Sequence, residues 1–233
     1  MKIHSFVPEI LIFCIISYFF VIPPLFVTTQ MVQSLDFSIF SFQNLIHFIL
    51  SLFLIIFYKN FSNIIYLNVY KKHKYLNGNL FFLCFSLICL NSLFFNFISN
   101  FFSNSIQHNS IMVSKPTSLI EYAICVLNLF FAAFFEETIY RFYLPTFILN
   151  LCYRLINKDG KNKNNTNYKF LNILIEIFVM LIFALSHRYL GIFSVLNATI
   201  AHIILRLTFV FSRNIFCSTI AHFLYNFTFL IFS

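Results

Sequence analysis

Long apolar runs recur along the whole chain, and they constrain its fold more than any other feature of the sequence. A transmembrane helix needs about 20 apolar residues, and about eight segments come close to that length. They are Phe6 to Val27, Ser38 to Tyr58, Leu80 to Phe102, Thr117 to Phe135, Thr138 to Ile156, Phe170 to His187, Leu190 to Phe211 and Ile215 to Phe232. With 60% hydrophobic and 9% charged residues, the chain could not hide this surface in a water-soluble fold. We therefore predict an all-α polytopic membrane protein, a bundle of seven or eight transmembrane helices embedded in the lipid bilayer.

The positive charge of the chain is concentrated in two of the links between these segments. The formal net charge is +8, and most lysines fall in Lys59 to Gly78 and in Asn157 to Lys169. This distribution indicates membrane orientation and contact with anionic head groups, and it argues against nucleic acid as a partner. If every segment crossed, three crossings would place the two basic loops on opposite sides, against the positive-inside tendency. We therefore expect one intervening segment not to cross the membrane fully. Thr138 to Ile156 is the segment that we expect not to cross, because it begins beside two carboxylates.

Those two carboxylates, Glu136 and Glu137, follow directly after an apolar run. Placing a carboxylate at membrane depth costs at least ~2.5 kcal/mol on insertion scales, so an ionisable group there is by default a functional hypothesis. Arg141 comes four residues after Glu137. Because residues at this spacing lie on one helix face, Glu137 and Arg141 can form an ion pair within their own helix.

Other polar groups fall on later apolar segments. His187 ends the sixth segment, and His222 and Asn226 lie in the eighth with the same spacing of four. Polar groups at membrane depth normally face the interior of a bundle, so we expect these side chains and Glu136 to converge on one cavity.

A plainer interpretation applies to single polar residues in a membrane. Most of them form hydrogen bonds between helices, each contributing ~0.6 kcal/mol on average. We assign His47, Asn91, Asn128, Asn197 and Glu176 to this class. The pair His202 and Arg206, also four residues apart, is left open by the sequence.

In these residues the chain resembles the CPBP intramembrane endopeptidases, which include the type II CAAX prenyl proteases. The motifs of that family are Glu-Glu-x-x-x-Arg, Phe-x-x-x-His and His-x-x-x-Asn, and all three occur here in order. They fall at Glu136, Glu137 and Arg141, at Phe183 and His187, and at His222 and Asn226. The resemblance covers roughly Ile120 to Phe227. It implies a division into N-terminal transmembrane helices, residues 1–116, and a protease core, residues 117–233, with motifs on the fourth or fifth, sixth and eighth helices.

The resemblance also implies a role for each residue. Glu136 would activate water and His187 would help to orient it, while His222 and Asn226 would donate to the oxyanion. Glu137 and Arg141 would form a supporting ion pair. The chain departs from the eukaryotic CAAX branch of the family around the second motif, where it reads Phe183-Ala-Leu-Ser-His-Arg-Tyr-Leu190, and His202 stands where the family often has a glycine. These departures leave the proteolytic core intact, and they bear on the substrate class.

The expected substrate is a prenylated CAAX protein or peptide that loses its carboxyl-terminal tripeptide, and the expected location is the endoplasmic reticulum. A CPBP peptidase with a non-CAAX substrate, a catalytically silent membrane scaffold and a proton-relaying transporter are the alternatives. No cofactor is expected. Zinc is the competing hypothesis, because Glu136, His187 and His222 could supply a two-histidine, one-carboxylate set. It is disfavoured because His-Glu-x-x-His is missing and the resemblance implies a metal-independent mechanism.

Overall fold

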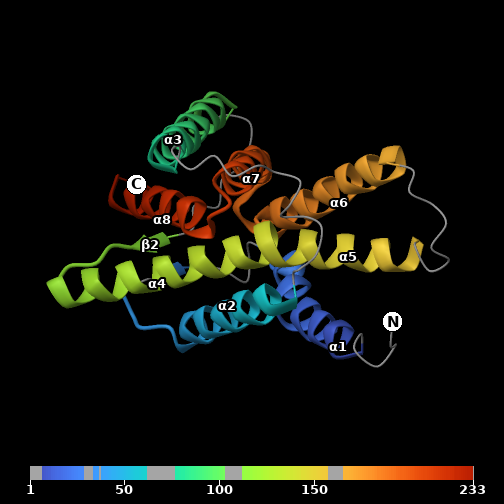
Figure 1. Ribbon diagram of the computed structural model, residues 1–233. Coiled ribbons are helices and arrows are strands. Elements are labelled where there is room, and N and C mark those ends of the chain that lie inside the picture. The colour runs from blue at the N-terminus through green and yellow to red at the C-terminus, as the bar shows by residue number, and fades with distance from the viewer. Residues whose placement is uncertain are drawn as a thin grey trace.

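The structure, a computed structural model, describes residues 7–28, 34–36, 38–61, 77–102, 112–156 and 165–232. The helical elements are α1 (Val7–Ile16), η2 (Ser17–Val21), η3 (Pro23–Phe26), α2 (Phe42–Phe61), α3 (Asn77–Phe102), α4 (Leu119–Glu137), η6 (Thr138–Tyr143), α5 (Leu144–Ile156), α6 (Asn165–Ser186), η8 (Arg188–Leu190), α7 (Ile192–Ser212) and α8 (Ile215–Phe232). Two short strands, β1 (Ser34–Asp36) and β2 (Met112–Ser114), pair in parallel. Figure 1 shows the other helices arranged around the long rod formed by α4 and α5.

Five helical spans in the described part of the chain are long and apolar enough to cross a membrane, and two shorter helices are apolar as well. Large apolar side chains on their outer faces are exposed, including Phe97 at 71% and Leu119 at 89%. Water would not tolerate so much apolar surface, whereas the hydrocarbon of a bilayer accommodates it. The predicted all-α polytopic membrane fold is confirmed.

The fourth and fifth apolar segments form one continuous helix rather than two. The span Leu119–Ile156 contains 38 residues, which corresponds to about 57 Å at the usual helical rise. Its amino end is capped, because Ser118 Oγ accepts from the Glu121 N–H at 3.3 Å and Glu121 Oε2 accepts from the Thr117 N–H at 2.7 Å. The sequence predicted two separate helices on either side of Glu137, and that prediction is wrong.

A π-helical turn, η6, joins the two halves of this helix. The Leu144 N–H bonds to the carbonyl of Ile139, five residues earlier. Pro145 follows and has no N–H, so the carbonyl of Arg141 lacks its usual helical donor. Arg206 of α7 supplies one, because its Nη1 donates to that carbonyl. The π-helical turn thus lets the helix continue past Pro145, and the hydrogen bond from Arg206 holds α7 against that turn.

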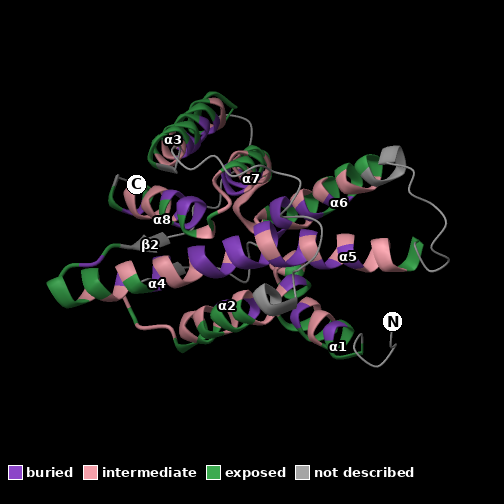
Figure 2. Ribbon diagram, in the orientation of Figure 1, coloured by how far each residue is buried: buried purple, intermediate pink, exposed green. Residues whose placement is uncertain are grey.

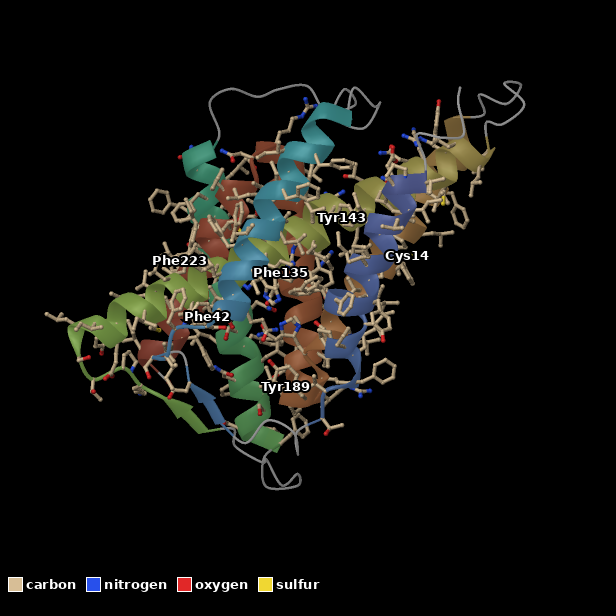
Figure 3. The ribbon with its side chains drawn as sticks, turned by 90° about the horizontal axis from the view of Figure 1, so that it is seen from below. Cys14, Phe42, Phe135, Tyr143, Tyr189 and Phe223 are labelled. Atoms are coloured by element: carbon tan, nitrogen blue, oxygen red, sulfur yellow. The ribbon has the colours of Figure 1, made fainter. Side chains whose placement is uncertain are left out.

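Merging the two segments changes the count of crossings between the basic loops. Only α3 and the α4–α5 rod now separate them. Figure 3 shows the carboxyl ends of α2 and α5 and the amino ends of α3 and α6 along one edge of the bundle. This arrangement is consistent with the positive-inside tendency. The loops themselves, expected to be basic and the second of them mobile, lie mostly at residues 62–76 and 157–164, outside the described residues.

The core surrounds the middle of the rod. Helix α4 packs between α2 and α8, α6 packs on α7, and α3 covers α7 and α8. Figure 2 shows burial concentrated around η6 and exposure rising toward both ends of the rod. The main cluster joins Ile139, Tyr143 and Phe147 of the rod to Val179 and Phe183 of α6. The most completely buried part of the bundle is therefore the part that carries the acidic motif.

Candidate active site

Glu137 and Arg141 lie in the buried centre of the bundle, and both side chains are fully excluded from solvent. Arg141 Nε stands 3.5 Å from Glu137 Oε1, so the pair expected from the spacing of four is present. None of the three guanidinium nitrogens has a hydrogen-bond partner in the described part of the structure. The charge of Arg141 is therefore held by the Glu137 carboxylate and by aromatic contact rather than by hydrogen bonds.

Phe183, the first residue of the second motif, supplies that aromatic contact. The guanidinium carbon of Arg141 lies 4.0 Å from the centre of the Phe183 ring, a cation–π geometry. The same ring lies 4.7 Å from the imidazole of His187 and 5.3 Å from that of His202, measured between ring centres. Phe183 thus joins the first and second motifs physically, which explains why an apolar residue belongs to a catalytic pattern.

His222 of α8 stands between the two glutamates. Its Nδ1 is 2.9 Å from Glu137 Oε1, and its Nε2 is 3.9 Å from Glu136 Oε2. A carboxylate oxygen paired with Arg141 can only accept, so His222 donates from Nδ1. The second nitrogen then faces Glu136. His222, the first residue of the third motif, is therefore in contact with the first motif.

A cavity of about 380 Å³ opens beside Glu136. Its wall includes Glu136, Tyr140, Ser186, His187 and Tyr189, together with residues from η2, η3 and the start of α2. The Glu136 side chain is 30% exposed, while Glu137 is completely buried. Of the two adjacent carboxylates, only Glu136 is within reach of water and a substrate.

The tautomer of His187 follows from its neighbours. Its Nδ1 lies 2.9 Å from the carbonyl oxygen of Phe183, which can only accept a hydrogen bond. Nδ1 therefore carries the proton, and Nε2 is left as the nitrogen available in the cavity. Because the carbonyl of Phe183 lies one turn back on α6, the second motif fixes both the position and the protonation of its histidine.

Asn226 stands apart from this group. It lies one turn beyond His222 on α8 and is half-buried. Neither Asn226 nor His222 is among the residues lining the cavity, and the Asn226 side chain makes no hydrogen bond to the described residues. The structure thus brings Glu136, Glu137, Arg141, His187 and His222 together and leaves Asn226 at their edge.

One cavity residue was not expected from the sequence. His47 of α2 lines the same cavity as Glu136 and His187, although its sequence context suggested a helix-to-helix hydrogen bond. Its ring stacks on Phe135 with centres 4.1 Å apart, and its Nε2 is buried without a hydrogen-bond partner in the described residues. A histidine within an apolar segment was the one sequence feature that could have indicated a role for His47 in the site, but nothing in the sequence placed α2 beside α4.

The pair His202 and Arg206 divides into two different environments. Arg206 forms a two-pronged ion pair with Glu176 of α6, with Nε 2.8 Å from Oε2. Glu176 thus bridges helices, as predicted for it. His202 is 2% exposed, and neither ring nitrogen has a partner in the described residues. His202 lies behind Phe183 and does not line the cavity beside Glu136.

No three His, Cys, Asp or Glu side chains in the described residues form a group that could hold a metal ion. Whether the reaction uses zinc is a separate question, and metal independence stays a prediction.

Comparison with known proteins points to one family. The family model described as Type II CAAX prenyl endopeptidase Rce1-like matches residues 118–228. The matched segment begins at the cap of α4 and ends within α8, so it contains the residues of all three motifs but not His47 or the other cavity residues that precede α4. No curated protein and no solved structure matches the chain.

Proposed function

Because residues 118–228 belong to the type II CAAX prenyl endopeptidase Rce1-like family, we propose that this chain hydrolyses peptide bonds with a water molecule activated by Glu136. The family assignment and the apolar helices make the chain an integral membrane protein of the CAAX-type intramembrane protease kind. The identity of the base, the substrate and the organelle belong to the proposal.

The difference between the two adjacent glutamates carries the assignment of the base. Glu137 is fully buried, is paired with Arg141 and accepts from His222. Glu136 lines the cavity, and its side chain is 30% exposed. A general base needs a free lone pair within reach of the water it deprotonates. Glu136 meets that requirement, and Glu137 does not.

His187 is proposed to hold the attacking water from the other side. With Nδ1 donating to the Phe183 carbonyl, Nε2 can accept a hydrogen bond from water in the cavity. Water held between this nitrogen and the Glu136 carboxylate would have both hydrogens directed at acceptors, with an oxygen lone pair free to attack the carbonyl carbon. Glu136 then passes the proton to the leaving nitrogen, so no Ser or Cys nucleophile is needed.

His222 and Asn226 are proposed to bind the oxyanion. This role sets a condition on His222, because its Nδ1–H is already donated to Glu137. Donation from Nε2 requires a second proton on the ring. Glu137 therefore has a task beyond balancing Arg141, since it accepts the Nδ1 hydrogen and orients the imidazole. Asn226 would have to approach the substrate from its position one turn further along α8.

The proposed substrate is a prenylated CAAX protein or peptide in the endoplasmic reticulum membrane. A cavity at membrane depth suits a lipidated peptide, because the attached chain can remain in the hydrocarbon while the peptide enters. Purified protein in lipid should release a tripeptide from a farnesylated CAAX peptide, as identified by mass spectrometry. Release from other membrane peptides alone would favour the non-CAAX alternative.

The base is tested by Glu136→Gln, which keeps the shape of the side chain and removes its basicity. We expect turnover to fall by ~10²-fold or more with no change in melting temperature. Glu121→Gln is the matched control, because it makes the same substitution on the same helix at an exposed cap. Near-normal turnover by Glu136→Gln would exclude the glutamate mechanism and favour a scaffold or a different base.

A further inference from the structure

Arg188 is flanked in the chain by two residues that line the cavity, although it is not itself a lining residue. It stands between His187 and Tyr189, which both line the cavity wall. Its side chain is exposed, and its Nε donates to the carbonyl of Val27 at 3.4 Å. Val27 lines the cavity as well. The guanidinium is therefore held at the rim between two segments of the wall, η8 and the end of η3.

The backbone under Arg188 is fixed. The Leu190 N–H bonds to the His187 carbonyl at 3.1 Å, and the Gly191 N–H bonds to the Arg188 carbonyl at 3.0 Å. Gly191 has a φ of 97°, a value that residues with a Cβ rarely adopt, and helix α7 begins directly after it. The turn η8 thus presents the arginine at a defined point beside His187.

Arg188 differs from the arginines of the bundle interior in its charge balance. Arg141, Arg154 and Arg206 each face a glutamate at 4.0 Å or less, in ion pairs with Glu137, Glu9 and Glu176. Arg188 has no carboxylate partner in the described part of the chain. A guanidinium has five N–H donors, and the long bond to Val27 uses one of them. The remaining donors form a fork that fits a carboxylate in a bidentate manner.

We propose that Arg188 binds the free α-carboxylate at the carboxyl end of the peptide substrate. The inference rests on the proposed function, because it places the scissile bond beside Glu136 and His187. A tripeptide leaving group in extended form reaches about 10 Å beyond that bond. Arg188 directly follows His187 and is bonded to Val27 of the cavity wall, so we place the carboxylate end of the leaving group beside it. The same residue explains how the site would select a chain terminus over an internal peptide bond.

Two farnesylated peptides of one sequence test the assignment, one ending in a free carboxylate and the other in an amide. Purified full-length protein in lipid vesicles should cleave the free acid with a kcat/KM at least about tenfold higher, as expected for a hydrogen bond to a charged group. In Arg188→Gln, kcat/KM for the acid should fall to the value for the amide, mainly through KM. Arg188→Lys should retain part of the preference. Arg213→Gln, at the opposite end of α7, should retain all of it.

Two results would overturn the proposal. Equal cleavage of acid and amide by the unaltered protein would mean that no group reads the carboxylate. An equal loss on both peptides in Arg188→Gln would mean that Arg188 holds a lipid phosphate or the rim of the cavity instead. Both results leave Glu136→Gln as an independent test, so failure of this subsite can be told from failure of the glutamate mechanism.

Discussion

Replacement of Arg141 by alanine is expected to destabilise the protein more than any other single change at the site. Both members of the Glu137–Arg141 pair are fully buried, so the substitution leaves a carboxylate at membrane depth without the cation that balances it. Breaking a buried pair by removing one partner typically costs ~3 to 5 kcal/mol. The contact of Arg141 with the Phe183 ring at 4.0 Å is lost as well, which favours the upper half of that range.

The loss can be measured as a melting temperature in detergent or lipid. For a chain of about this size, 1 kcal/mol shifts the midpoint by ~2 to 4 °C, so the expected decrease is roughly 6 to 20 °C. Arg154→Ala is the matched control, because Arg154 pairs with Glu9 at 3.2 Å but is 24% exposed. Water reaches Arg154, so the loss of this pair should cost less than the loss of the fully buried pair, although Glu9 itself is only 6% exposed.

A double-mutant cycle separates the charge effect from packing. Glu137→Gln combined with Arg141→Met removes both buried charges, so the double variant should be more stable than Arg141→Met alone. The reasoning would be refuted if Arg141→Ala lowered the melting temperature no more than Arg154→Ala. Such a result would mean that Arg141 reaches water or substrate in the membrane-embedded protein.

Three further outcomes are expected. Asn226→Ala should lower kcat by ~10²-fold or more with little effect on peptide affinity. When it is combined with His222→Ala, the loss of kcat should be smaller than the product of the two single losses, because both side chains donate to one oxygen. Equal effects on binding and turnover would make Asn226 a packing or substrate contact. Activity should survive dialysis against strong chelators, whereas a loss restored by added zinc would make the histidines metal ligands. Reporter tags inserted in the loops at residues 62–76 and 157–164 should be accessible from the same side of the membrane, and labelling from opposite sides would contradict the single crossing by α4 and α5.

Much of the site could be predicted because its geometry is local. The pairing of Glu137 with Arg141 depends only on a spacing of four within one helix, and the same spacing places Phe183 beside His187. The convergence of His222 on these residues followed from the high cost of leaving polar groups in lipid. The family resemblance supplied the roles, and most of those roles await the variants described above.

The missed features depend on contacts between distant segments. Two adjacent glutamates in an apolar run looked like a helix boundary, whereas the burial of Glu137 against Arg141 and His222 allows the helix to continue. Donation by Arg206 to the carbonyl of Arg141 could not be inferred, since the partner lies 65 residues away. His47 was assigned a structural role for the same reason, because the packing of α2 against α4 leaves no trace in its local sequence.

The long helix has a mechanical consequence. At about 57 Å, the span Leu119–Ile156 is nearly twice the ~30 Å thickness of a bilayer core, so it must lie at a steep tilt or project from the hydrocarbon. Figure 3 shows it running obliquely across the bundle. Its midpoint falls between Glu137 and Thr138, at the acidic motif. If a change in bilayer thickness alters the tilt of this helix, the two ends of the helix move most and its midpoint moves least. The buried charges of Glu137 and Arg141 therefore lie near the point of the helix whose depth in the membrane depends least on bilayer thickness.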